Sequence, residues 1–185
     1  MKHLFRTISI FSVIAVLGAT SVALAEGQHA FTAQEAFTAM KTLSGDWTGE
    51  ELVVSAGKTM AEGTKGKASV SYKTIAAGST VMATYLEGSA AEMVSMYHMD
   101  GTDALIHTHY CAAQNQPSMA FRPSTEAGAI DFRFTHGTNM DVHKDGHAHH
   151  SYIKIIDADH YESRSETWAN GKLASTRYTK MTRKK

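Results

Sequence analysis

Apolar residues recur with a helical period over residues 31–44. Thr32 stands where an N-cap is expected, Glu35 follows three residues later in a capping-box pattern, and Gly45 marks the end. The apolar positions fall on one stripe of such a helix, formed by Phe37, Met40 and Leu43 or Ser44. We therefore predict one short helix here, with that stripe turned toward the protein interior.

After Gly45 the period of the apolar positions changes from helical to two. Ten short segments of this kind have turn signals between them, and they lie near 46–54, 67–75, 80–86, 92–99, 104–111, 119–123, 129–135, 148–156, 160–168 and 172–181. Turns as short as Asp100-Gly101 and Asn170-Gly171 join antiparallel neighbours. Because an open up-and-down sheet would leave two long edges, we predict a mainly β fold, a single antiparallel up-and-down β-barrel with one short N-terminal helix.

The first 25 residues have the pattern of a secretory signal peptide. Two basic residues precede an apolar run over 8–17, and the segment ends in Ala23-Leu24-Ala25, which suits signal peptidase. The apolar run is shorter than the roughly 20 residues that span a bilayer. We expect an exported protein, periplasmic or secreted after cleavage at Ala25, with residues 26–185 as one domain and no membrane span in the mature protein.

The charge composition limits the classes of molecule that the protein is expected to bind. The chain has 18 Lys and Arg and 18 Asp and Glu, and loss of residues 1–25 leaves 16 basic and 18 acidic side chains, a formal charge of −2. This balance argues against a nucleic-acid partner. The basic residues near the C-terminus are expected to be solvated: Lys180, Arg183, Lys184 and Lys185. Cys111 is the sole cysteine, so no disulfide can form within the chain.

The Gly45-Asp46-Trp47 segment after a short helix resembles the Gly-x-Trp opening of lipocalin-like (calycin) β-barrels. That resemblance implies a Trp47 that packs across the closed end of the barrel near an arginine of a late strand. Arg177 and Arg183 are both candidates for this arginine.

From about Phe37 to its end, the chain is also similar to a set of uncharacterised exported bacterial proteins. The residues that carry this resemblance are Met96-Tyr97-His98-Met99-Asp100-Gly101, Thr108-His109-Tyr110-Cys111, Asn115-Gln116-Pro117, Asn139 and His147-Ala148-His149. The resemblance implies a lipocalin-like barrel and export, and it implies no reaction.

The chain is rich in histidine, with eleven in all and ten after residue 25. If Asp100 to Asp103 form a hairpin loop, His98 lies opposite Leu105 and Met96 lies opposite His107. One face would then hold Val94, Met96, His98, Leu105, His107, His109 and Cys111. Later in the chain, His147 and His149 share the parity of Ile153 and Ile155, so we expect them to face the interior as well.

Imidazole, thiolate and thioether groups are ligands of zinc, copper and haem iron. The predicted ligand-binding residues are therefore Met96, His98, His109, Cys111, His147 and His149, of which His109, Cys111, His147 and His149 are the candidate metal ligands. Two plainer interpretations stay open: residues 141–150 are a wet polar loop, and His109 is a hydrogen-bonded core histidine. No Cys-x-x-Cys-His motif for covalent haem attachment is present.

Three functions remain. The preferred one is an exported protein that holds a small apolar or haem-like ligand in a barrel cavity. The second is a periplasmic protein that binds a transition metal, zinc or copper. The third is a barrel-based enzyme that uses Cys111, or a histidine-bound metal, as its centre; the chain shows no phosphate loop, nucleophile elbow or His-Glu-x-x-His helix to favour it.

Overall fold

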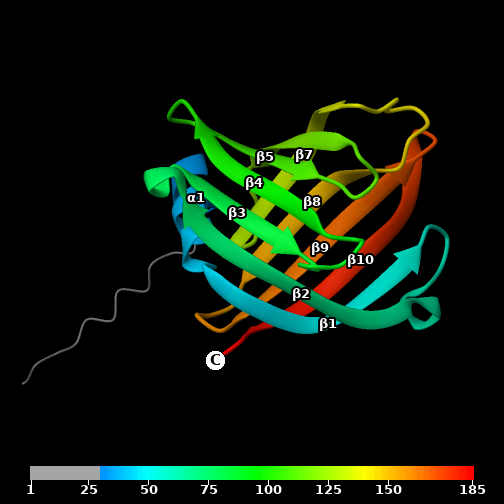
Figure 1. Cartoon of the computed structure of the whole chain (residues 1–185), viewed down its shortest axis with the longest axis horizontal. Coiled ribbons are helices and arrows are strands. Elements are labelled where there is room, and N and C mark those ends of the chain that lie inside the picture. Colours follow the sequence, from blue (N-terminus) through cyan, green and yellow to red (C-terminus); the bar gives the residue numbers. More distant parts are fainter. Residues whose placement is uncertain (1–29) are drawn as a thin grey trace, which may run out of the picture.

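A computed structural model describes residues 30–185, so the predicted signal peptide and its cleavage site at Ala25 lie outside the described residues. Ten antiparallel strands follow one another around a closed barrel, and the first strand pairs with the last (Figure 1). The strands are β1 (Gly45–Ser55), β2 (Thr64–Ile75), β3 (Thr80–Tyr85), β4 (Met93–Asp100), β5 (Ala104–Tyr110), β6 (Gln116–Arg122), β7 (Ala129–Thr138), β8 (His147–Ile155), β9 (His160–Ala169) and β10 (Lys172–Arg183). The predicted mainly β barrel is confirmed.

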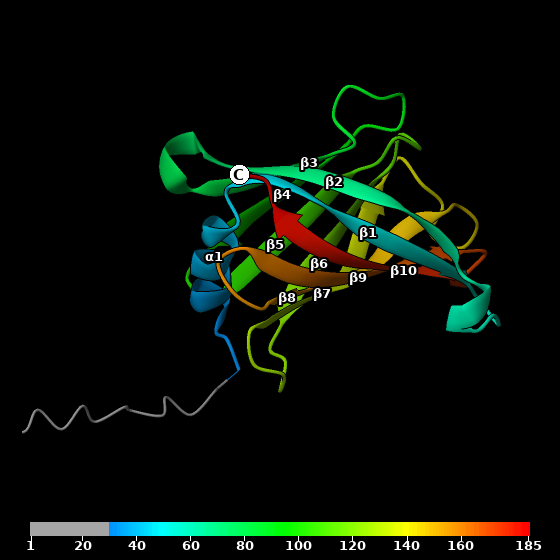
Figure 2. The same cartoon turned by 90° about the horizontal axis from the view of Figure 1, so that it is seen from below.

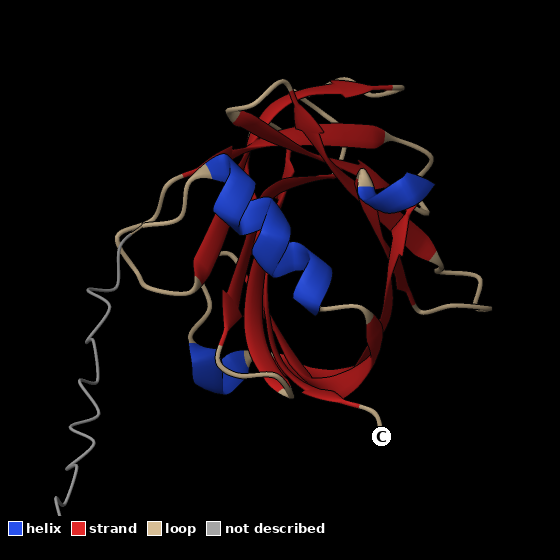
Figure 3. Ribbon diagram, turned by 90° about the vertical axis from the view of Figure 1, so that its left-hand side faces the viewer, coloured by secondary structure: helices blue, strands red, loops and turns tan. Residues whose placement is uncertain are grey.

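The predicted helix is α1 (Ala33–Thr42), and it begins with the expected capping box. The Glu35 backbone N–H donates to Thr32 Oγ1 at 3.2 Å, and the Thr32 N–H donates to the Glu35 carboxylate at 2.8 Å. Two 3₁₀ turns, η1 (Met60–Glu62) and η2 (Ala76–Gly78), lie in the loops that flank β2. Seen along the barrel, α1 lies across one end (Figure 3), which we call the closed end.

The apolar stripe of α1 is buried at the closed end, as predicted: Phe37, Met40 and Leu43 are at most 3% exposed. They pack with inward side chains of the barrel, among them Val81 and Leu105. Since adjacent strands run in opposite directions, the other end is where the five odd-numbered strands finish and the five even-numbered strands begin. We call it the open end, and within residues 30–185 no helix as long as α1 covers it (Figure 2).

Trp47 joins α1 to the barrel. Its ring is fully buried, its Nε1 donates to the Leu43 carbonyl at 2.7 Å, and the Arg183 guanidinium lies 4.2 Å from the ring centroid. Arg183 also donates to the Thr42 carbonyl at 2.9 Å and to the Ser44 carbonyl at 2.6 Å. Arg183, not Arg177, is thus the partner of this tryptophan.

The expectation of a fully solvated basic C-terminus is wrong for Arg183. This residue is the last of β10, and its guanidinium satisfies carbonyl groups that the C-terminal end of α1 leaves without helical partners.

The β4–β5 hairpin has a register one residue away from the predicted one. Asp100 pairs with Ala104 across a three-residue loop that starts at Gly101, whose φ of +67° suits glycine. Met99 therefore lies opposite Leu105, and His98 lies opposite Ile106. A shift of one residue turns every side chain of a strand to the other face, so the inward residues of β4 are Ser95, Tyr97 and Met99.

Candidate functional site

The barrel encloses a cavity of about 370 Å³. Its wall includes residues from strand ends that lie away from α1, such as Tyr85 of β3, Met93 of β4, His109 of β5 and His147 of β8. Deeper in the barrel, the wall continues with Val70, Tyr72, Met119, Ile153, Tyr161 and Met181. The cavity is therefore an interior hollow that faces the open end and is mostly apolar at its base.

Two histidines of β5 share one serine of β4. His107 Nε2 lies 2.9 Å from Ser95 Oγ, and His109 Nδ1 lies 3.0 Å from the same oxygen. Ser95 is 1% exposed and His107 is 3% exposed, and both histidines form part of the cavity wall. We call these three residues the Ser95 cluster. Within the described residues, His107 Nδ1 has no hydrogen-bond partner.

Burial keeps both imidazoles of the Ser95 cluster neutral. Desolvation holds the pKa of His107 well below its usual range, and the neighbouring His109 adds to this effect. Desolvation also lowers the pKa of His109 to about 4. The two rings are therefore uncharged hydrogen-bonding groups at neutral pH, and neither can neutralise an anionic ligand.

Tyrosine hydroxyls complete this side of the interior. The Tyr97 ring stacks on His107 with a centroid separation of 4.4 Å, and its hydroxyl lies 3.2 Å from that of Tyr85. Tyr72 and Tyr161 form a second pair, with hydroxyls 3.5 Å apart. Burial raises the pKa of Tyr72 and of Tyr97 well above the usual range, so these groups are also neutral.

An ion pair lies on another part of the wall. Arg177 of β10 donates to the Glu51 carboxylate of β1 at 2.6 Å, and both residues line the cavity. The Arg177 side chain is 45% exposed, which places it near the rim rather than at the base. The sequence identified Arg177 only as a possible partner of Trp47, and the inward parity of β10 gives it this different position.

His147 lies on the cavity wall, as predicted, but both of its ring nitrogens are already engaged. Nδ1 lies 2.9 Å from the Asp145 carbonyl oxygen, which can only accept, so this nitrogen donates. Nε2 lies 3.1 Å from His149 Nδ1. His149 is held between two aromatic rings: its centroid is 3.9 Å from that of Trp168 and 4.8 Å from that of Phe134. His149 is not part of the cavity wall.

A β-bulge explains the position of His149. The β8–β9 register shifts between Ala148 and His150, which leaves His149 as the extra residue. His150, which the sequence did not single out, becomes the buried one, 1% exposed. Its Nε2 lies 2.7 Å from Asp131 and its Nδ1 lies 3.2 Å from Glu166. These two carboxylates anchor the bulge.

The structure separates the predicted site residues into two groups. His109, Cys111 and His147 line the cavity, whereas Met96 and His98 belong to the outward face of β4 and His149 packs between aromatic rings. Cys111 is half-buried, with its sulfur 3.9 Å from that of Met93. Within residues 30–185, no three His, Cys, Asp or Glu side chains gather closely enough to hold a metal ion.

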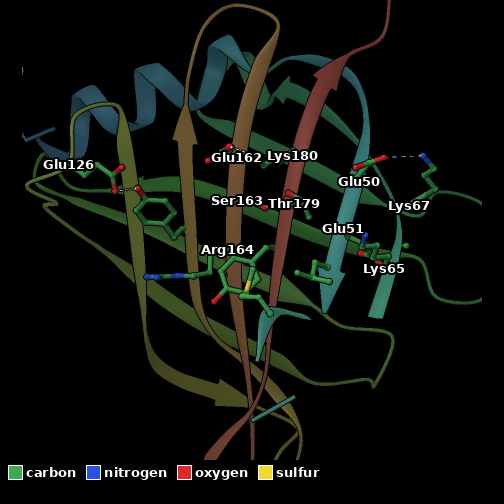
Figure 4. A pocket seen from close by; sticks show the side chains of 15 residues that line it. Glu50, Glu51, Lys65, Lys67, Glu126, Glu162, Ser163, Arg164, Thr179 and Lys180 are labelled. Carbon is green, nitrogen blue, oxygen red and sulfur yellow. Dashed lines mark hydrogen bonds and ion pairs between the residues drawn. The ribbon is translucent and has the colours of Figure 1, made fainter. Parts of the chain in front are cut away.

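Another hollow, of about 770 Å³, lies on the outer surface over β1, β2, β9 and β10 (Figure 4). Four of its charged side chains form pairs between neighbouring strands: Lys180 with Glu162 at 3.7 Å, and Lys67 with Glu50 at 3.9 Å. Solvated pairs of this kind are ordinary features of an outer barrel face. We therefore take the interior cavity as the candidate site.

Comparison with known proteins bears on the fold. One similar solved structure is a protein of unknown function from the DUF3598 family of Nostoc punctiforme PCC 73102, with 13% identity and a TM-score of 0.53. That match covers 77% of this chain and 48% of the other, so this chain spans about half the length of that protein. Another is Rv2717c from M. tuberculosis, with 13% identity, a TM-score of 0.54, and coverage of 81% and 98%. What they share with this chain is the fold.

No protein-family model matches the chain, and no curated protein matches it in sequence. Among residues 30–185, no helix is long and apolar enough to cross a membrane.

Proposed function

We propose that this protein binds a small, largely apolar molecule inside the barrel and admits it from the open end. The observation that carries the proposal is the 370 Å³ interior cavity, which lies within the usual range for small-ligand sites. Its base is formed by apolar and tyrosine side chains, and a few polar groups stand on its wall. Such sites typically combine apolar walls with a small number of placed polar groups.

The closed end supports this proposal. Trp47 and α1 fill one end of the barrel, so ligand entry is restricted to the opposite end. The same Trp47 and Arg183 arrangement is what the lipocalin-like (calycin) resemblance implies, and calycin barrels carry their ligands in the interior. We further propose that the protein is exported, because the N-terminal pattern is that of a cleaved signal peptide.

A haem-like planar molecule is one member of the proposed ligand class. A neutral imidazole nitrogen is one of the side-chain ligands that hold the iron of such a molecule. His109 Nε2 makes no hydrogen bond to another described residue, and the lowered pKa of His109 keeps its ring unprotonated. A Soret shift on titration with haemin, lost in His109→Phe, distinguishes this member from colourless ligands.

Titration with Nile red, an apolar dye that fluoresces on leaving water, tests the proposal. We expect saturable binding to the wild type and at least a tenfold loss in Ala68→Trp, because residue 68 lies on the cavity wall and an indole there fills the space. Thr48→Trp is the matched control: it places the same indole on the outer face of the neighbouring strand, where Thr48 is exposed. Equal binding by the two variants would show that the dye sits elsewhere.

A further inference from the structure

The Ser95 hydroxyl has too few hydrogens for both of its imidazole neighbours. It owns one hydrogen, yet His107 Nε2 and His109 Nδ1 each lie within hydrogen-bond distance of its oxygen. At least one ring must therefore donate its own N–H to Ser95. A neutral imidazole carries a single N–H, so the ring that donates is left with a bare lone pair on its other nitrogen.

Every arrangement of the hydrogens leads to the same result. If Ser95 donates to His107, then His109 donates to Ser95, and the lone pair lies on His109 Nε2. If Ser95 donates to His109, the lone pair lies on His107 Nδ1. If the serine hydrogen points elsewhere, both distal nitrogens carry lone pairs. The cluster thus always has at least one hydrogen-bond acceptor that no other described residue uses.

One of the two distal nitrogens is accessible to a ligand. Both rings form part of the cavity wall. His107 Nδ1 is fully buried with no partner within the described residues, so it is closed to the cavity. His109 Nε2 makes no hydrogen bond to another described residue and is not fully buried, so it is the nitrogen that a ligand can reach. A ligand that donates to His109 Nε2 is compatible with both arrangements in which His109 donates to Ser95. Among the described residues, no carboxylate forms a hydrogen bond with either ring, so no such contact favours their protonated forms.

We infer that the polar end of the bound molecule is a neutral hydrogen-bond donor, an O–H or N–H group such as an alcohol, a phenol or a primary amide, and that His109 accepts its hydrogen while Ser95 and His107 hold the ring. This inference rests on the proposed function, because it specifies the ligand of the same cavity. The Glu51–Arg177 pair at the rim is the alternative contact, and it would select a carboxylate instead.

Two isomeric ligands test the contribution of the donor hydrogen to binding. Nonan-1-ol and methyl octyl ether have the same formula and nearly the same apolar surface, but only the alcohol donates. In competition against Nile red, we expect nonan-1-ol to displace the dye from the wild type at about a fivefold lower concentration than the ether, the effect of one hydrogen bond. Nonanoate, which is an anion at pH 7.5, should be weaker than the alcohol.

Variants locate the acceptor. The double variant His107→Phe, His109→Phe should bind Nile red, and the two isomers should displace the dye from it at equal concentrations. His98→Phe makes the same change on the outer face of β4 and should keep the fivefold preference. Equal displacement by the isomers in the wild type overturns the inference even if the double variant does not fold, and tighter binding of nonanoate would assign the polar end to Arg177. Failure of Nile red to bind the wild type overturns the proposed function as well.

Discussion

The two ends of this barrel differ in how completely their polar groups are satisfied. At the closed end, the Trp47 indole and the Arg183 guanidinium bond to backbone carbonyls around the end of α1, and apolar side chains fill the remaining space. Toward the open end, the barrel keeps a cavity, and one ring nitrogen of His107 has no hydrogen-bond partner in the part of the chain that the structure describes. The closed end is packed like a hydrophobic core, whereas the open end leads to a cavity suited to a ligand.

The largest change in stability that we expect comes from removing the Trp47 indole at the closed end. Trp47→Ala should lower the free energy of unfolding by about 3–5 kcal/mol, because a fully buried indole leaves a cavity and a lost hydrogen bond. Trp168→Ala at the open end is the matched control and should cost clearly less, since Trp168 is only half-buried. Urea denaturation measures both, and equal losses would remove the contrast between the ends.

The second effect is a dependence of stability on pH that originates in the Ser95 cluster. Above pH 6.5, His109 is neutral in the folded and unfolded chains and contributes no slope. Between pH 6.5 and about 4, the unfolded chain binds a proton that the folded chain refuses, so stability falls as the pH is lowered, by about 3 kcal/mol for this histidine.

His107 adds to that loss, because its pKa is lowered in the same direction. The comparison is between wild type and the double variant His107→Phe, His109→Phe, with urea denaturation at pH 7.5 and pH 5. The difference in their stabilities should shrink or reverse in favour of the variant at the lower pH. A wild type that loses no more stability than the variant would mean that these rings are protonated in the folded state.

A smaller effect sharpens the roles of the two arginines of β10. Arg183→Met should cost about 2 kcal/mol, because it leaves the carbonyls of Thr42 and Ser44 without their charged donor. Arg177→Met should cost less than about 1 kcal/mol, because its ion pair with Glu51 is partly exposed at the rim. Thermal unfolding of both variants ranks them, and the reverse order would contradict the assignment of Arg183 to the closed end.

The sequence predicts the fold well because the fold depends on repeated local signals. The capping box of Thr32 and Glu35, the alternation along ten segments and the short turns between them all favour the same barrel, and each is confirmed. Trp47 as the closing residue is predicted from three residues, although the choice between Arg177 and Arg183 needed the geometry of the closed end.

The site is predicted less well, because its residues depend on single-residue details of register. A hairpin loop one residue shorter than predicted turns Met96 and His98 outward and brings Ser95 beside His107. A bulge in β8 removes His149 from the wall and buries His150. Neither a loop length nor a bulge changes the hydrophobic pattern enough to be read from it.

Ser95 is a further residue of the site that the sequence pattern does not reveal. A serine in the middle of a strand has no signal of its own in the sequence, and it matters here because two imidazoles from the neighbouring strand converge on it. The positions of the histidines on β5 are predicted correctly by alternation from Leu105. Their common partner depends on the pairing of β4 with β5, which the one-residue error concealed.

Native mass spectrometry tests the central claim most directly. The protein is purified without denaturant from its natural host cells. We expect a mass above that of the polypeptide, lost on denaturation, with a small molecule carrying an O–H or N–H group in the extract. Ala68→Trp should lack this extra mass and Thr48→Trp should keep it. A wild type that shows only the polypeptide mass, or an extra mass that Ala68→Trp retains, would contradict a ligand held in the barrel cavity.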